Sequence, residues 1–180
     1  MLSHDASPEL IDVINDRDET VGVVERRLSY ARGLSHRIVH VMIERQGRLF
    51  VVRRSLTTRY LPGYFCTSAG GHVLAGESIT QAAARELQEE VGVSGKLQHV
   101  DTFSFYHEFR VSVSLFVLQT NSVVMTLNEH EVMSGDFYSP EALDALDRAL
   151  FHPQLDICIA KARTYLKLGL GLGPELEVSK

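Results

Sequence analysis

The chain is predicted to fold as one layered α/β domain, and three observations point to this class. Apolar, β-branched runs alternate with short polar turns through most of its 180 residues. Among them stands one helix-like segment, residues 78–92, with an acidic side and an apolar side. Two further helix-like segments follow the last strand. Strands and helices in this order are expected to pack as layers around one core.

The N-terminal part is predicted to form a β-hairpin. Residues 10–15 and 21–27 favour strands, and the polar run 15–19 between them favours a turn. The stretch 55–63 contains Thr-Thr and Pro-Gly and is predicted to be a loop. The remaining strands are predicted from their β-rich composition at residues 36–44, 49–53, 65–69, 96–105, 109–119 and 132–139.

The central helix carries clear end signals. Ser78 is a capping residue, and Gln81 three positions later completes a capping box. Gly92 suits a left-handed end. Residues 140–150 begin with a proline and predict a second helix. Residues 153–168 predict a third helix, whose apolar face combines Leu155, Cys158, Ile159, Ala162, Tyr165 and Leu166.

Composition narrows the range of functions. The net charge of −5 and the pI near 5.9 argue against a general surface for nucleic-acid polymers. Two cysteines are too few for a disulfide framework, which favours a reduced cytoplasmic setting. The first ten residues lack the pattern of a secretion signal, and no apolar run approaches the length of a membrane span. We therefore expect a cytoplasmic protein without membrane contact.

The most informative run extends from Gly71 to Val93. Gly71 is followed after five residues by Glu77 and, after seven more, by the segment RELQEEVGV. On a helix, Glu86, Glu89 and Glu90 fall within an arc of about 100°. Each such like-charge pair costs a few tenths of a kcal/mol, and no basic residue follows four positions later. A cation between the carboxylates would relieve the repulsion, whereas a solvated acidic face is the simpler alternative.

This run resembles the Nudix box at every fixed position: Gly, Glu, Arg-Glu, an aliphatic residue, Glu-Glu, Gly and a second aliphatic residue. The resemblance implies an α/β/α sandwich with a mixed central sheet, here preceded by the N-terminal hairpin. It also implies a metal-dependent hydrolase that cleaves a diphosphate linkage in a nucleoside diphosphate joined to another moiety. The flanking pairs Arg26-Arg27, Gly33-Leu34 and His36-Arg37 resemble the branch of isopentenyl-diphosphate isomerase-like Nudix proteins.

The resemblance also implies a set of metal ligands: the carboxylates of Glu86, Glu89 and Glu90 and the carbonyl of Gly71. Mg²⁺ is the predicted ion, with Mn²⁺ as the alternative, because hard cations prefer oxygen ligands. Glu77 and Arg85 are expected to pair and to hold the loop against the helix. A direct contact of Arg85 with substrate is the less favoured interpretation.

Candidate residues outside the metal set follow from their chemistry. Arg53 and Arg54 end a strand beside the box, and one of them is expected to bind phosphate, although a role in solubility is equally plausible. His72 could meet a phosphate or orient a water, or could simply be a satisfied loop residue. The predicted general base is Glu131, with Glu129 in reserve and Glu89 or Glu90 as the alternatives, because the chemistry requires only a carboxylate near the attacking water.

Two other functions remain open at this point. An isomerase of isopentenyl diphosphate would need a cysteine where Gly70 stands, and Cys66 is displaced by several residues. A non-catalytic nucleotide-binding module usually loses box carboxylates, and this chain keeps them. The predicted partner is a small-molecule diphosphate, and the hairpin could cover the second copy of a homodimer. The predicted organisation is an extension at 1–34, the catalytic domain at 35–168 and a mobile tail at 169–180.

Overall fold

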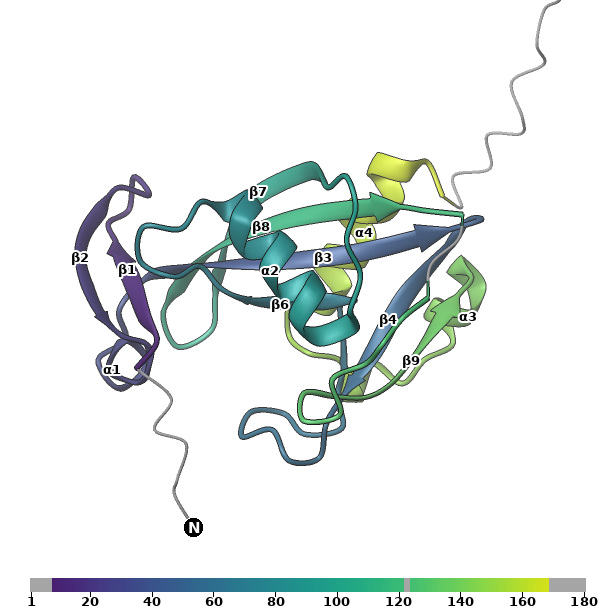
Figure 1. Cartoon of the computed structure of the whole chain (residues 1–180), viewed down its shortest axis with the longest axis horizontal. Coiled ribbons are helices and arrows are strands. Elements are labelled where there is room, and N and C mark those ends of the chain that lie inside the picture. Colours follow the sequence, from purple (N-terminus) through teal and green to yellow (C-terminus); the bar gives the residue numbers. More distant parts are fainter. Residues whose placement is uncertain (1–7, 122–123, 169–180) are drawn as a thin grey trace, which may run out of the picture.

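The structure of the protein, a computed structural model, describes residues 8–121 and 124–168 (Figure 1). A mixed seven-stranded sheet lies at its centre, in the order β5-β4-β3-β8-β7, with β6 paired to β3 and β9 paired to β4. Strands β3 and β8 run parallel, and the other pairs are antiparallel. The sheet strands are His36–Arg45 (β3), Arg48–Arg54 (β4), Phe65–Cys66 (β5), Ala69–His72 (β6), Gln98–Tyr106 (β7), Arg110–Gln119 (β8) and Val132–Tyr138 (β9).

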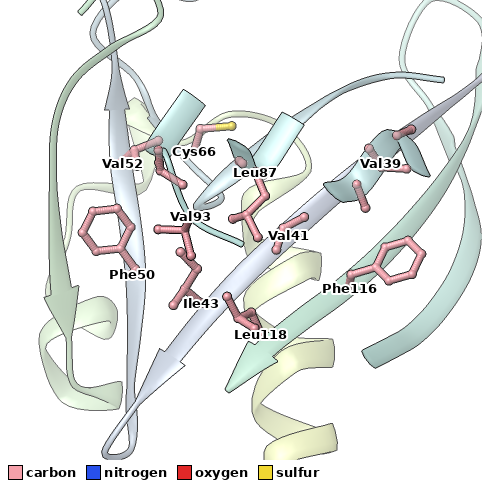
Figure 2. Packing of buried hydrophobic residues seen from close by; sticks show 14 of the residues in the cluster. Val39, Val41, Ile43, Phe50, Val52, Cys66, Leu87, Val93, Phe116 and Leu118 are labelled. Carbon is pink, nitrogen blue, oxygen red and sulfur yellow. The ribbon is translucent and has the colours of Figure 1, made fainter. Parts of the chain in front are cut away.

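Helices cover both faces of this sheet, so the predicted α/β sandwich is confirmed. Strand β3 is buried on both sides, as its nearly continuous apolar sequence requires. Its residues Val39, Val41 and Ile43 pack toward helix α2 (Ile79–Val91), together with Leu87 (Figure 2). On the opposite face, Met42 of β3 packs with helix α4 (Leu155–Leu166). The alternation along β3 therefore separates two hydrophobic cores.

Helix α2 begins and ends as its sequence predicts. The Ser78 hydroxyl accepts from the backbone N–H of Gln81, and the Gln81 side chain accepts from the Ser78 N–H, which completes the capping box. Gly92 takes the left-handed conformation, with φ of 67°. The apolar stripe is placed slightly differently from the prediction. Leu87 and Val91 are buried as expected, but Ala84 is exposed, and Ala82 and Ala83 face the core instead.

Residues 65–69 form two short strands rather than one. The interruption lies at Thr67 and Ser68, where the chain passes from β4 to β3. The Ser68 hydroxyl donates to the Phe50 carbonyl (2.6 Å) and accepts from the Ile43 N–H (2.8 Å). A side chain thus replaces one rung of the backbone ladder, which lets β6 start beside β3 and brings its two glycines to the box helix.

The N-terminal hairpin is present, as strands β1 (Leu10–Ile14) and β2 (Thr20–Glu25). The prediction that the second strand continues to residue 27 is wrong, because a helix, α1 (Arg26–Ala31), begins directly after it. The Ser29 hydroxyl donates to the Arg26 carbonyl, and Ser29 is completely buried. Figure 1 shows the hairpin and α1 together at one end of the central sheet.

The C-terminal helices are shorter than predicted. Helix α3 spans Pro140–Asp144, and a 3₁₀ turn follows at Arg148–Leu150 instead of a continuous helix. The Asp147 carboxylate accepts from the Ala149 N–H and so competes with helical hydrogen bonding. Tyr165 of α4 is exposed rather than packed. No helix within the described residues is long and apolar enough to span a membrane, and the predicted tail at 169–180 lies outside them.

Candidate active site

The candidate site lies where strand β6 meets helix α2. Gly71 pairs with Val39 and therefore faces α2, and a β-carbon built on it would lie only 2.2 Å from Glu86 Oε1. The Gly70 N–H points to Glu90 Oε1 at 3.4 Å. Two carboxylates of the helix are thus drawn against the backbone of two consecutive glycines. No other residue would permit this approach at position 71.

Arg85 connects the parts of this arrangement. Its guanidinium donates to both oxygens of Glu77, at 3.0 Å each, which confirms the predicted pair. Its Nη1 also donates to Glu86 (2.8 Å) and Glu89 (3.2 Å), and its Nη2 donates to the His72 carbonyl (2.9 Å). No basic residue follows the three carboxylates four positions later, but Arg85 relieves the acidic face from four positions before Glu89.

Burial divides the three helical carboxylates into two groups. Glu86 and Glu90 are each only 8% exposed, whereas Glu89 points to solvent. Burial raises the pKa of Glu86 to about 7 against the opposing effect of Arg85. Burial also raises the pKa of Glu90, and the charges of Glu86 and Glu131 raise it further. In this state the two buried groups hold protons more readily than ordinary carboxylates do, since each charged form lacks sufficient compensation.

Glu131 lies in the loop before β9 and extends this cluster. Its negative charge raises the pKa of both Glu86 and Glu90. The Asn128 side-chain amide donates to Glu131 at 3.1 Å, and the backbone N–H of Asn128 donates to the Glu90 carbonyl at 2.9 Å. The loop is therefore attached to the end of α2. Glu129 lies in the same loop and is exposed to solvent.

The two predicted arginines have different surroundings. Arg53 donates from Nε and Nη2 to the Gly63 carbonyl, and its guanidinium lies 5.0 Å from the centre of the Phe65 ring. In the described part of the chain, the hydrogen bond of the Arg54 guanidinium runs from Nε alone, to the Tyr60 carbonyl at 3.0 Å. The positive charge of Arg54 lowers the pKa of Glu90, against the larger effect of burial. Arg53 is occupied by loop structure, and Arg54 keeps its outer nitrogens available.

His72 lies on the other side of β6 from the carboxylates. It pairs with Ile38, so its ring points away from α2, and Tyr30 Oη forms a hydrogen bond with its Nε2 at 2.9 Å. Burial lowers the pKa of His72, as do the charges of Arg26, His36 and Arg85. Its ring is consequently neutral at physiological pH. No local pattern pointed to Tyr30, because 42 residues separate it from His72 and the helix that carries it was not predicted.

These residues fit a divalent cation by their chemistry. Glu86 and Glu90 are buried oxygen donors whose charged forms need a positive partner, and Gly71 leaves the space that a side chain would fill. Within the described ranges, no three His, Cys, Asp or Glu side chains already form a group able to hold a metal ion. Arg85 engages Glu86 and Glu89 in this arrangement, so a bound ion would take over part of the charge compensation that Arg85 supplies.

Comparison with known proteins agrees with this geometry. A family model described as "NUDIX domain" matches residues 34–156. The Nudix hydrolase YfcD of Escherichia coli (strain K12), described as uncharacterized, is 31% identical over 156 residues, covering 78% of this chain and 86% of YfcD. The uncharacterized Nudix hydrolase SCO1686 of Streptomyces coelicolor is 39% identical over 104 residues. That match covers 57% of this chain and 58% of the length of SCO1686.

The fold is similar to that of a solved structure as well. The crystal structure of DR0079 from Deinococcus radiodurans superposes with a TM-score of 0.73 at 28% sequence identity. The superposition covers 87% of this chain and 99% of DR0079. The similarity therefore extends beyond the box helix to the arrangement of the sheet that positions it.

Replacement of Gly71 by alanine tests the close approach of Glu86. We expect Gly71→Ala to lower the free energy of unfolding by about 1–3 kcal/mol, because the new methyl group forces the buried carboxylate out of its place. Urea denaturation measures this change. Gly22→Ala is the matched control, since a β-carbon at that position would meet no atom within 4 Å and its effect should stay below about 1 kcal/mol. Equal stability of the Gly71 variant and the wild type would contradict the contact.

Proposed function

Since the chain belongs to the Nudix hydrolase family, we propose that it hydrolyses the diphosphate linkage of a nucleoside diphosphate joined to another moiety. The observation that carries this proposal is the pair of buried carboxylates, Glu86 and Glu90, held against the backbone of Gly70 and Gly71. A merely solvated acidic face would not bury them. Glu131 adds a third carboxylate and Arg54 adds a cationic side chain, and the charges of both affect the pKa of Glu90.

We propose that Glu86, Glu89, Glu90 and the Gly71 carbonyl hold the divalent ion, with Mg²⁺ as the physiological metal and Mn²⁺ as the alternative. When bound, such an ion neutralises phosphate oxygens and acidifies a water. Glu89 is exposed and bonded only at one oxygen to Arg85 in the described structure. Its side chain can therefore turn toward the glycines without unpacking the helix, whereas Glu86 and Glu90 are already buried against them.

Glu131 is the proposed general base. Its carboxylate is exposed, is anchored through Asn128, and lies close enough to Glu86 and Glu90 to act on both. An exposed carboxylate beside the proposed ligands can accept a proton from the attacking water while the ligands stay on the metal. Glu89 and Glu90 are the alternatives. Comparing Glu131→Gln with Glu129→Gln tests the assignment of the base to Glu131. The assignment fails if both variants hydrolyse substrate at the wild-type rate.

Arg54 is the proposed phosphate-binding residue. Among the described residues its guanidinium bonds through Nε, which leaves its two outer nitrogens to form paired hydrogen bonds with a phosphate. We expect Arg54→Ala to raise KM about tenfold or more, because it removes a charge-assisted contact of roughly 1.5–3 kcal/mol. Arg53→Ala should mainly lower thermal stability, since Arg53 supports the loop at Gly63. Steady-state kinetics and thermal unfolding of the two variants check this division, and a larger KM effect for Arg53 would reverse it.

His72 is proposed to contact the substrate on the face of β6 opposite the carboxylates. The diphosphate would then cross the edge of β6, with the metal side at Gly71 and the other moiety near His72. Because its ring is neutral, His72 would contribute a hydrogen bond to the substrate and not a positive charge. Phosphate charge would fall to Arg54 and the metal ion.

The isomerase alternative lacks a usable cysteine. A side chain at position 70 would lie 2.6 Å from His40 Nδ1 and 2.7 Å from the Val39 carbonyl, so the backbone there accepts only glycine without rearrangement. Cys66 is buried, and burial raises the pKa of its thiol. Neither position can present a reactive thiol to a substrate. The proposed relation to the isomerase-like branch would therefore concern ancestry and not chemistry.

The direct test is a screen of diphosphate compounds with Mg²⁺ and with Mn²⁺, following the phosphate products by mass. Nucleotide sugars, dinucleotides, nucleoside triphosphates, coenzyme A and nucleotide-linked alcohols form the panel. Release of phosphate-containing products from at least one class supports the hydrolase. Tight binding of a panel compound without any cleavage would identify a binding module instead and would refute the proposal.

Glu90→Gln separates catalysis from folding. We expect turnover to fall about 10²–10⁴-fold, because the variant removes a carboxylate from the proposed ligand set while keeping its size. The fold should stay intact, as a neutral side chain is less costly to bury than a carboxylate. Circular dichroism and kinetics measure both effects, with Glu141→Gln on the distant helix α3 as the control. Unchanged hydrolysis by Glu90→Gln would remove Glu90 from the metal assignment.

Assembly and location are also proposals. Strand β2 exposes Val21 (62%) and Val23 (52%) on the outer edge of the hairpin, a surface that a second copy of the chain could cover. A light-scattering mass of one chain at micromolar concentration would contradict the homodimer.

The two free, buried cysteines are consistent with the proposed cytoplasmic setting, which subcellular fractionation can check.

A further inference from the structure

The N-terminal segment lies outside the matched family domain but contacts the box loop. Ile11 of β1 is completely buried and forms an isolated bridge with Leu74, directly after the end of β6. The Ala75 N–H donates to the Leu10 carbonyl at 2.8 Å. The family model begins only at residue 34. The hairpin is therefore joined to the loop that follows the box glycines and forms one structural unit with it.

Helix α1, which follows the hairpin, places Tyr30 against His72. Tyr30 Oη and His72 Nε2 lie 2.9 Å apart. The helix itself is fixed by the buried Ser29, whose carbonyl accepts from the Leu34 N–H at 2.8 Å. Tyr30 remains 49% exposed, so its ring is not needed to fill the core. The hydroxyl contact is the feature that connects this helix to β6.

The His72 ring is held on two sides. Its face stacks on His36, with ring centres 5.1 Å apart and planes inclined by 28°. Its edge meets Tyr30, and Tyr30 in turn makes an edge contact with Phe109 at 5.4 Å. Stacking alone would leave the His72 ring free to slide or turn over the His36 ring. The hydrogen bond from Tyr30 fixes which nitrogen faces α1.

His36 is an unusual support for such a stack. It is completely buried, its Nδ1 donates to the Leu34 carbonyl at 3.0 Å, and its Nε2 has no hydrogen-bond partner among the described residues. An unpartnered buried polar atom costs about 1–3 kcal/mol. A phenylalanine would avoid that cost but would lose the hydrogen bond to the Leu34 carbonyl. The imidazole therefore anchors the chain at Leu34 while its face supports the His72 ring.

We propose that Tyr30, supported by His36, is a positioning residue that orients the His72 ring for substrate. This inference rests on the proposed function, in which His72 contacts the substrate across the edge of β6. The His72 backbone is already fixed by Arg85, whose Nη2 donates to its carbonyl at 2.9 Å. Only the direction of the ring remains to be set, and α1 sets it. The N-terminal extension thus completes a site that the matched domain does not complete alone.

Tyr30→Phe tests this proposal, because the substitution keeps the ring and removes the hydroxyl. We expect kcat/KM for the substrate found in the screen to fall about tenfold, as with loss of other second-layer contacts, with thermal stability unchanged. Tyr165→Phe is the matched control: Tyr165 is 44% exposed and its hydroxyl donates to Gln98 on β7 at 3.0 Å, away from β6. The control should hydrolyse substrate within twofold of the wild type.

A second measurement reads the His72 ring without substrate. Imidazole nitrogen resonances, recorded at one pH by proton–nitrogen correlation, should shift for His72 Nε2 in Tyr30→Phe and stay unchanged for His40. Unchanged His72 resonances, or shifted resonances with wild-type kcat/KM, would overturn the role of Tyr30. Failure of the wild type to cleave any diphosphate would instead refute the proposed function, so the two failures are distinguishable.

Discussion

The site depends on one constraint: two carboxylates on the same helix must be buried side by side against a backbone that carries no side chain. Removing Glu86 and Glu90 from water is costly, and their repulsion adds to that cost. Gly71 leaves the space, Gly70 offers its N–H, and Arg85 supplies the compensating charge. Each feature lowers the cost of burying the two carboxylates, and a bound dication would lower it further.

The rest of the fold keeps helix and glycines in register. The capping box at Ser78 and the left-handed Gly92 fix both ends of α2, while Leu87 packs onto β3 from the adjoining side of the helix. Glu77 and Arg85 attach the preceding loop to the same helix. The position of α2 is therefore set by interactions that do not involve Glu86 or Glu90. These interactions keep α2 folded, although the burial of its charged side chains destabilises the helix.

Local chemistry was predictable, whereas contacts between distant segments were not. The fixed spacing of the box predicted the helix, both of its ends and the pair formed by Glu77 and Arg85. Helical geometry placed three carboxylates on one arc, but only packing decides that Glu86 and Glu90 turn inward and Glu89 outward. Helix α1 was missed because six residues without a capping side chain give almost no periodic signal. Its contact with His72 had no local signal at all.

The alternation of residues along strand β6 gives the site two different sides. Consecutive side chains of a strand point to opposite faces, so Gly71 turns to the carboxylates and His72 to Tyr30 and His36. In the proposed function, this four-residue strand separates an acidic side, which would hold metal and phosphate, from an aromatic side, which would meet the group beyond the diphosphate. The acidic side is built entirely within the matched domain. The aromatic side includes Tyr30 from outside it, so under this proposal a change in the N-terminal helix would alter recognition without changing the carboxylates.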